Sequence, residues 1–239
     1  MNVLHGGASR ADYYEKHTST RSLRTYPTSH QSHKKKDWAK KFMDRDFLLN
    51  TDTAKKLYHE YAENLPIIDY HCHISPREIY EDKVYPNITQ LWLGVGGSNF
   101  GDHYKWRFMR SCGVEEKYIS GNAPDEERFA KWAGCLSKAA GNPLYHWSHM
   151  ELQKYFGIHE PLTERNADEV YATCNEKLQK KDLSVRGIIK QSNVKLICTT
   201  DDPIDSLEWH QKLAEDDGFE TTVLPVNVNE YLSQALANI

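Results

Sequence analysis

The chain has 239 residues, of which 39% are hydrophobic and 27% are charged, and its formal net charge is −4. This size allows one large domain or two small ones with a sizeable core. The absence of any apolar run of about eighteen residues excludes a membrane-spanning helix, and the mildly acidic body argues against nucleic acid as a partner.

The cysteines bear on the cellular compartment. There are five, without a Cys-x-x-Cys pair. An odd number of dispersed thiols indicates a reducing environment, so we expect a cytoplasmic protein without a disulfide framework or a structural zinc finger. The five are Cys72, Cys112, Cys135, Cys174 and Cys198.

Residues 1–41 form a basic head, with nine Lys or Arg against three Asp or Glu. This segment is rich in Ser, Thr and His and has few aliphatic residues, so it cannot bury enough apolar surface to order itself. We therefore predict a disordered basic extension over 1–41. A transit-type targeting segment is the functional alternative, but the coherent sequence that starts at Met43 favours a plain extension.

The first regular element is a helix over 50–65. Asn50 or Thr51 can cap its N-terminus, and Pro66 ends it. Apolar side chains recur three and four residues apart, as on one face of an amphipathic helix. These side chains are Ala54, Leu57, Tyr58, Tyr61, Ala62 and Leu65.

The stretch between Pro66 and Pro76 carries the main chemical signal. Its short apolar run over 67–74 predicts a buried strand. Because alternate side chains of a strand point to the same face, His71 and His73 project on one side. Neutral imidazole is a common ligand of zinc and related divalent cations, so the pair is a candidate metal site. The alternative is two partly exposed histidines that follow a core strand.

A glycine-rich loop over 94–101 and an ionisable cluster over 102–107 come next. The loop has neither the Lys-Ser/Thr of a P-loop nor a preceding strand, so a surface loop is favoured over a phosphate-binding one. The cluster reads Asp-His-Tyr-Lys-Trp-Arg. Its spacing is compatible with a binding site and with the amphipathic start of a helix, and leaves both open.

Residues 122–192 are predicted to be helical. The second of these helices ends at Gly157 and carries His146 and His149, three residues apart on one face. That pair could ligate a metal, but a half-buried aromatic face is the better interpretation. The four helices begin at Pro124, Asn142, Asn166 and Ser184, each a typical N-terminal residue.

Two further strands are predicted at Val194–Thr200 and 222–225. Between them, Asp201-Asp202-Pro203 turns the chain into a helix that carries Ile204, Leu207, Leu213 and Ala214. Such a strand–helix–strand unit requires a parallel sheet, and parallel α/β proteins carry their chemistry at the C-terminal ends of the strands. Asp201 is therefore a candidate catalytic carboxylate, with capping of the next helix as the alternative.

Five motifs follow one another along residues 42–225. They are Phe42-Met-Asp-Arg-Asp-Phe-Leu-Leu, Ile68-Asp-Tyr-His-Cys-His, Gly101-Asp-His-Tyr-Lys-Trp-Arg, Gly141-Asn-Pro-Leu-Tyr-His-Trp and Cys198-Thr-Thr-Asp-Asp-Pro. In this order they resemble the uronate isomerase (glucuronate isomerase) family of amidohydrolase-like metal-dependent barrels. The resemblance implies an α/β fold. Residues 42–239 would form about three strands of an incomplete (β/α)8 TIM-type barrel, with a large helical insertion over about 77–192 between strands one and two.

The resemblance also implies a reaction. The family isomerises D-glucuronate to D-fructuronate, and D-galacturonate to D-tagaturonate, in hexuronate catabolism. His71 and His73 match the ligands of a divalent metal, usually zinc, which would be the cofactor. The expected partner is a uronate sugar, and a homo-oligomer stays open.

Three residues of the ionisable cluster receive roles from the same resemblance. Tyr104 matches a tyrosine at the reacting end of the sugar, where a phenol can donate a hydrogen bond to developing negative charge. His103 and Arg107 are the candidate substrate-binding residues, since an arginine fork suits the carboxylate of the sugar.

The chain departs from the family pattern in three places. Residues 95–100 look inserted before the Gly-Asp-His-Tyr motif. After Pro225 the family continues with Arg-Pro-Asp, whose arginine contacts substrate, whereas this chain reads Val226-Asn-Val-Asn. The late-strand aspartate that the family uses at the metal and as base is expected beyond Ile239. Two alternatives to an active isomerase therefore remain: a metal-dependent hydrolase of the same superfamily, and a non-catalytic metal-binding fragment.

Overall fold

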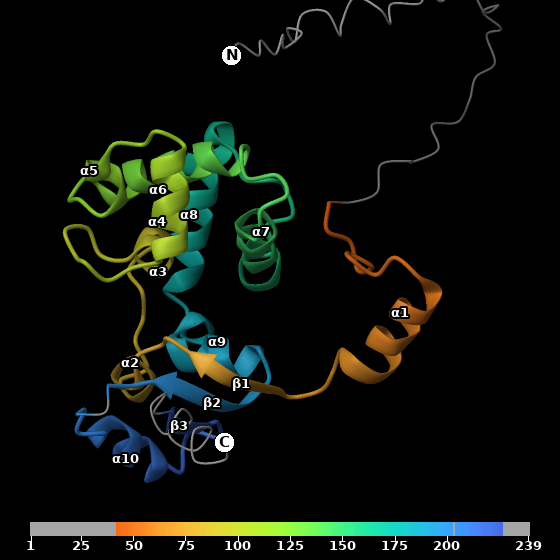
Figure 1. The fold of residues 1–239 in the computed structure, drawn as a ribbon, viewed down its shortest axis with the longest axis vertical. Coiled ribbons are helices and arrows are strands. Elements are labelled where there is room, and N and C mark those ends of the chain that lie inside the picture. Colours follow the sequence, from red (N-terminus) through yellow and green to blue (C-terminus); the bar gives the residue numbers. More distant parts are fainter. Residues whose placement is uncertain (1–41, 203, 227–239) are drawn as a thin grey trace, which may run out of the picture. The chain divides into compact units, whose positions relative to one another are not determined.

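The structure is a computed structural model that describes residues 42–202 and 204–226 (Figure 1). The extension predicted over 1–41 lies outside these residues. None of the helices in the described ranges has the length and apolar character needed to cross a membrane.

The three predicted strands are confirmed, and they form one parallel sheet in the order β1-β2-β3. Ile67 on β1 pairs with Val194 on β2, and Leu196 on β2 pairs with Thr222 on β3. The predicted α/β class is therefore confirmed. The strands are β1 (Ile67–Cys72), β2 (Val194–Thr200) and β3 (Thr222–Val226).

The prediction that β1 is buried is wrong. Of its six residues only Cys72 is buried, and the ring of Tyr70 is 81% exposed. Among the strands that the structure describes, β1 is at the edge and pairs with β2 alone. An apolar run indicates a buried strand only when both of its faces are covered. Within the described residues, helix α9 (Val185–Gln191) packs on β2, while β1 lies open to solvent.

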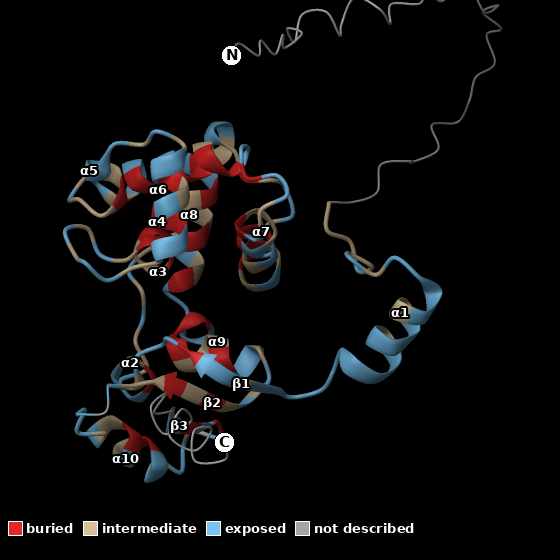
Figure 2. Ribbon diagram, viewed as in Figure 1, coloured by how far each residue is buried: buried red, intermediate tan, exposed pale blue. Residues whose placement is uncertain are grey.

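The helix predicted over 50–65 is present as α1 (Asp52–Leu57) followed by a π-helical turn over Tyr58–Ala62. Thr51 is the cap, because its hydroxyl oxygen accepts a hydrogen bond from the Ala54 backbone N–H at 3.1 Å. No residue of α1 or of the π-helical turn is buried, and Figure 2 shows α1 mostly in pale blue. The apolar face of this helix thus has no partner among the described residues.

Helices occupy the chain between β1 and β2. Their starts follow the sequence signals closely: the side chains of Asn87, Asp102, Asn142 and Ser184 each accept hydrogen bonds at a helix N-terminus. The helices are α2 (Pro76–Tyr80), α3 (Ile88–Leu93), α4 (His103–Ser111), α5 (Glu116–Ile119), α6 (Asp125–Leu136), α7 (Pro143–Phe156), α8 (Ala167–Leu178) and α9, with 3-10 turns at Glu164–Asn166 and Lys181–Leu183.

Local backbone and side-chain chemistry sets the C-terminus of α7 and the N-terminus of α8. Gly157 ends α7 in the left-handed conformation, with φ +60°, as predicted. Asn166 precedes α8 as predicted, but its side chain accepts from the N–H and hydroxyl of Thr163 and does not cap α8. Thr163 and Asn166 therefore form a capping box around the 3-10 turn that precedes α8.

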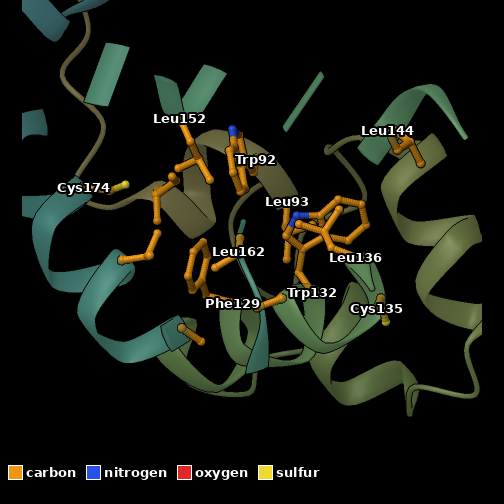
Figure 3. Close-up of a cluster of buried hydrophobic side chains, with 14 of the residues drawn as sticks. Trp92, Leu93, Phe129, Trp132, Cys135, Leu136, Leu144, Leu152, Leu162 and Cys174 are labelled. Atoms are coloured by element: carbon orange, nitrogen blue, oxygen red, sulfur yellow. The ribbon is translucent and has the colours of Figure 1, made fainter. Parts of the chain in front are cut away.

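The larger of the two apolar cores lies among α3, α4 and α6–α8. Figure 3 shows its centre, where aromatic and aliphatic side chains of these helices interlock. The guanidinium of Arg128 is fully buried beside this core and donates to the backbone oxygens of Gly94 and Ile119 and to the carboxylate of Asp125. Asp125 also accepts from Asn87 and Gln90, so one polar network joins α3 to α6.

The chain enters and leaves this helical region through one narrow connection, which we call the neck: residues 79–83 and 185–186. The Val185 N–H donates to the Lys83 carbonyl oxygen at 3.0 Å. Arg186 donates from its side chain to the carbonyl oxygens of Ile79 and Tyr80, and from its backbone to Asp82. The two ends of the helical region are thus fastened to each other.

A smaller core joins the sheet to α2, α9 and α10 (Glu208–Ala214). The helix predicted to carry Ile204 and Leu207 begins later than expected. Ile204 is exposed, and Leu207 has a left-handed φ of +54°, which is incompatible with a helical residue. α10 therefore starts at Glu208 and buries His210 and Leu213.

Candidate functional site

The histidine pair lies at the C-terminal end of β1. His71 is in the strand, and His73 follows its last residue, Cys72. The Nε2 atoms of the two rings are 3.2 Å apart, and the rings meet edge to face with centroids 4.8 Å apart. Both side chains are exposed. The strand period predicted that these rings share a side, and the structure agrees.

A threonine of the neighbouring strand holds one of the two rings. The hydroxyl oxygen of Thr200, the last residue of β2, is 2.9 Å from Nδ1 of His73. The same hydroxyl donates to the Cys72 carbonyl oxygen at 3.3 Å. His73 is therefore fixed from the side opposite to its contact with His71.

The geometry of the pair fits two ligands of one cation. Zinc binds imidazole nitrogen at about 2.0–2.1 Å in a tetrahedron, which places two such nitrogens about 3.3–3.4 Å apart. The observed Nε2–Nε2 separation of 3.2 Å is close to this value. Across the described ranges, however, no group of three or more His, Cys, Asp or Glu side chains forms a metal cluster. These residues supply two ligands, so the others would have to come from elsewhere.

Asp201 lies just beyond the end of β2, but its side chain points into a small hydrogen-bonded cluster. Its Oδ2 accepts from the hydroxyl of Thr199 at 2.7 Å, and Nε2 of His210 lies 2.7 Å from the same hydroxyl. The Asp201 side chain is only 10% exposed. It does not cap α10, whose N-cap is Leu207, so the capping alternative is wrong.

His210 is a residue that sequence reasoning missed. It is buried on α10, and its Nδ1 has no hydrogen-bond partner within the described part of the chain. A polar side chain on the inward stripe of a short helix, three residues before Leu213, is the one signal in the sequence that could have identified it.

The other candidate residues lie at the start of α4. Asp102 caps this helix by accepting from the N–H groups of Tyr104 and Lys105, so the ionisable cluster is a helix start, one of the two interpretations left open. The Tyr104 side chain is 70% exposed, and the Arg107 guanidinium lies 5.7 Å from its ring centroid. His103 packs its ring edge to face on Trp106, with 5.1 Å between centroids.

Tyr104 and Arg107 line a groove of about 550 Å³ between α4 and the start of α7. Trp147 and the segment 142–144 form its other wall. This wall belongs to the Gly141–Trp147 motif, so two of the five motifs meet here. Neither His71, His73 nor Asp201 lines the groove. The structure therefore places the candidate residues in two groups, one at the strand ends and one beside α7.

Of the second pair of histidines, His146 and His149, the ring of His149 has a structural role. Nδ1 of buried His149 bonds to the Tyr145 carbonyl oxygen, and its Nε2 accepts from the Leu162 N–H. Burial lowers the pKa of His149, which keeps the ring neutral. The rings of Phe42 and Tyr145 pack on it edge to face. Of the half-buried aromatic face predicted from Tyr145, Trp147 and Tyr155, the two tyrosines are partly buried as expected, whereas Trp147 is 55% exposed. Both ring nitrogens of His149 are used in protein hydrogen bonds, so this ring is not a metal ligand.

The glycine-rich loop closes on itself. A Cβ at Gly94 would lie 2.3 Å from the Phe100 carbonyl oxygen, and one at Gly101 would lie 2.4 Å from the Leu93 carbonyl oxygen, so only glycine fits at both ends. The Phe100 side chain is 85% exposed. Residues 95–100 are therefore a short surface excursion with adjoining ends, as the favoured interpretation predicted.

The sequence matches known proteins closely. Residues 39–230 match the family model for glucuronate isomerase. The uronate isomerase of Endomicrobium trichonymphae is 61% identical over 186 residues, which are 78% of this chain and 38% of that relative. The uronate isomerase of Lachnospira eligens is 62% identical over 186 residues, with the same shares covered. The chain thus spans a little over a third of the length of these relatives.

Solved structures agree in fold. The uronate isomerase of Thermotoga maritima superposes with a TM-score of 0.70 at 34% identity, over 77% of this chain and 39% of that one. The glucuronate isomerase of Caulobacter crescentus gives 0.67 at 24% identity, which supports the fold alone. With a family model that covers most of its residues, this chain belongs to the glucuronate isomerase family.

Proposed function

We propose that this chain acts as the metal-binding N-terminal part of a uronate isomerase, which interconverts D-glucuronate with D-fructuronate and D-galacturonate with D-tagaturonate. The observation that carries the proposal is the pair of Nε2 atoms 3.2 Å apart at the end of β1 in a member of this family. A divalent cation, zinc by the chemistry of its ligands, would be held by His71 and His73.

The proposed architecture is that of a (β/α)8 barrel. The three parallel strands in the order β1-β2-β3, and the histidines at a C-terminal strand end, support this arrangement. We further propose that residues 42–239 are the first part of the barrel, with a helical insertion over about 77–192, and that residues 1–41 are a basic extension. A soluble enzyme of sugar catabolism would work in the cytoplasm.

Isomerisation moves a proton between adjacent carbons through an enediol, so the site must stabilise oxyanion charge and transfer a proton. A bound cation would supply a Lewis acid for the carbonyl oxygen. The Tyr104 phenol would donate a hydrogen bond to the developing oxyanion, and Asp201 would carry the proton. Its Oδ2 accepts a hydrogen bond from the Thr199 hydroxyl in the described cluster.

Substrate binding falls to the start of α4. Exposed Arg107 presents a guanidinium that suits the sugar carboxylate, and His103 would bond to sugar hydroxyls. The family resemblance, rather than a shared groove, associates these side chains with the histidine pair. A uronate bound by this chain would therefore have to bridge the histidine pair and the start of α4.

Two other functions fit the same histidines. A metal-dependent hydrolase of the superfamily would use further ligands, and the match of the whole segment to glucuronate isomerase disfavours it. A non-catalytic metal-binding fragment would keep the metal and lack turnover.

A chimera tests the proposal directly. The 186-residue matched segment of the Endomicrobium trichonymphae uronate isomerase would be replaced by the matching residues of this chain. We expect the purified chimera with zinc to convert D-glucuronate or D-galacturonate to the ketose, and the His71→Ala/His73→Ala form to lose both metal and turnover. In the Tyr104→Phe form, turnover should fall while the metal content stays.

The result that contradicts the proposal is a folded, zinc-loaded chimera that converts neither uronate. Hydrolysis of an ester or amide by that chimera would favour the hydrolase. Zinc binding without any reaction would favour the non-catalytic fragment.

A further inference from the structure

We infer that Thr200 is a positioning residue for the histidine pair: its hydroxyl fixes His73 as the Nδ1–H tautomer and so directs the lone pair of Nε2 toward His71. The inference rests on the proposed metal site, which it deepens by assigning a supporting residue on the neighbouring strand. It concerns the state of one ring, so it can be tested with or without turnover.

The hydrogen bonds of the Thr200 hydroxyl determine which nitrogen of His73 carries the proton. A threonine hydroxyl has one proton to donate and can also accept. The Cys72 carbonyl oxygen can only accept, so the 3.3 Å contact uses the hydroxyl proton of Thr200. The 2.9 Å contact between the same oxygen and Nδ1 of His73 is then a hydrogen bond only if Nδ1 carries the proton. Both bonds together require the Nδ1–H tautomer of His73.

The consequence appears at the other ring nitrogen. A neutral imidazole with its proton on Nδ1 has a bare lone pair on Nε2. In His73 that atom faces Nε2 of His71 at 3.2 Å. Metal-binding histidines commonly donate their second N–H to a fixed oxygen, which sets the tautomer and raises the basicity of the ligating nitrogen. Thr200 provides such an oxygen.

The two histidines differ in this respect. Among the described residues, the one hydrogen-bond partner of the His71 ring is His73, while its backbone N–H donates to Asp69. Without a cation, the His71 Nε2–H can donate to the lone pair of His73. His73 is therefore prepared for a cation in advance, whereas His71 must give up its Nε2 proton when one binds.

The strand provides the right position for Thr200. Thr199 and Thr200 are neighbours on β2, so their side chains point to opposite faces. Thr199 is buried and bonds to Asp201 and His210, and Thr200 bonds to His73. The two adjacent threonines of the Cys198-Thr-Thr-Asp motif thus support different side chains at the same strand end.

Substitutions isolate the hydroxyl. Thr200→Val keeps the branched shape and removes both hydrogen bonds, whereas Thr200→Ser keeps the hydroxyl. Thr222→Val, at an exposed threonine of β3, is the matched control for the same chemical change on a strand away from the histidines. Circular dichroism and thermal unfolding establish that each variant is folded.

The first measurement is the tautomer of His73 in the metal-free full chain. Long-range proton–nitrogen NMR spectra at about pH 8, where histidines are mostly neutral, distinguish the two ring nitrogens, and a His73→Ala spectrum assigns the signals. We expect the Nδ1–H form in the wild type, in Thr200→Ser and in Thr222→Val, and a mixed population in Thr200→Val.

The second measurement is the affinity for zinc alone, by competition with a chromogenic chelator. Loss of a supporting partner weakens metal affinity by about 10–100-fold, so we expect that increase in the dissociation constant for Thr200→Val and values close to wild type for Thr200→Ser and Thr222→Val. An Nε2–H tautomer in the wild type overturns the inference, and so does a wild type that binds zinc no more tightly than folded, zinc-binding Thr200→Val.

The proposed function can fail separately. If the chimera lacks isomerase activity while Thr200→Val still changes the tautomer and the zinc affinity, the role of Thr200 stands and the isomerase proposal does not. If the wild type binds no zinc but shows the Nδ1–H tautomer lost in Thr200→Val, the positioning stands and the metal does not.

Discussion

Two regions of this chain differ in how many apolar side chains they bury. One is the helical region between β1 and β2, and the other is the sheet together with the preceding helix α1. In the described residues, the helical core contains twenty-one buried side chains and the sheet core contains seven. The first region buries Phe129 and Trp132 almost completely, whereas β1 leaves Ile68 and Tyr70 exposed and α1 buries nothing. The helical region therefore has the larger share of the apolar contacts that stabilise the described part of the chain.

The same contrast separates stability from chemistry. The helical region holds most of the buried apolar surface, and the histidine pair lies on the poorly covered strand. Residues at strand ends are free to bind a ligand because they are not needed for packing. The proposed metal ligands His71 and His73 and the larger apolar core thus lie in different parts of the chain.

The largest expected effect comes from the centre of the helical core. Trp132 is fully buried, so Trp132→Ala should lower the free energy of unfolding by about 3–5 kcal/mol, because it removes a large apolar side chain and leaves a cavity. Urea unfolding followed by circular dichroism measures the loss.

Tyr70→Ala is the matched aromatic truncation on β1. Since this ring is 81% exposed, the same measurement should change by about 0.5 kcal/mol or less. Similar losses for the two variants would mean that β1 is packed in solution, and the contrast between the regions would not hold.

An intermediate effect, and a dependence on pH, should come from Asp125. Burial raises the pKa of this carboxyl, but hydrogen bonds from Gln90, Asn87 and Arg128 outweigh it and leave the pKa below its usual value. A carboxyl with a lowered folded-state pKa adds stability above its unfolded pKa of about 3.9, and this is lost as the pH falls through the folded-state value.

Asp125→Asn should therefore cost about 2 kcal/mol at neutral pH, since charged hydrogen bonds are lost, and should flatten the acid side of the stability curve. Urea titrations at neutral pH and at about pH 3 test this. Asp168→Asn, at an exposed aspartate in the first turn of α8, is the control. An equal acid loss in wild type and Asp125→Asn would show that the network does not hold the ionised carboxylate.

A small effect is also expected at the rim of the helical region. Excision of residues 95–100 joins Gly94 to Gly101, whose backbones already adjoin. It removes the exposed Phe100 and the bonds that the Gly97 N–H donates to Ser120 and Gly121. The free energy of unfolding should change by less than about 1 kcal/mol, because short loops contribute little closure entropy. A loss of several kcal/mol would place this excursion in the core.

The sequence predicted the features that depend on neighbouring residues. The strands, the caps at Thr51, Asn142 and Ser184, and the left-handed end at Gly157 follow from local backbone chemistry. The placement of His71 and His73 on one side follows from the strand period. These need no knowledge of what the element later contacts.

The features that failed depend on distant parts of the chain. Whether β1 is buried depends on what covers it, and its own apolar residues cannot reveal that. The late start of α10 follows from the left-handed conformation of Leu207, which has no sequence signal. The cluster of Thr199, Asp201 and His210 forms only when α10 packs against β2.

The neck has a consequence for the order of folding. Pairing of Ile67 with Val194 requires closure of a very long loop, which is entropically costly and slow for an unfolded chain. Once the helical region has formed, the bond from Val185 to Lys83 brings its two ends together, and only the short segments 73–82 and 186–193 remain to be closed. The folded helical region thereby shortens the loop that must close before β1 and β2 pair, and the sheet can form almost as if the two strands were consecutive in the sequence.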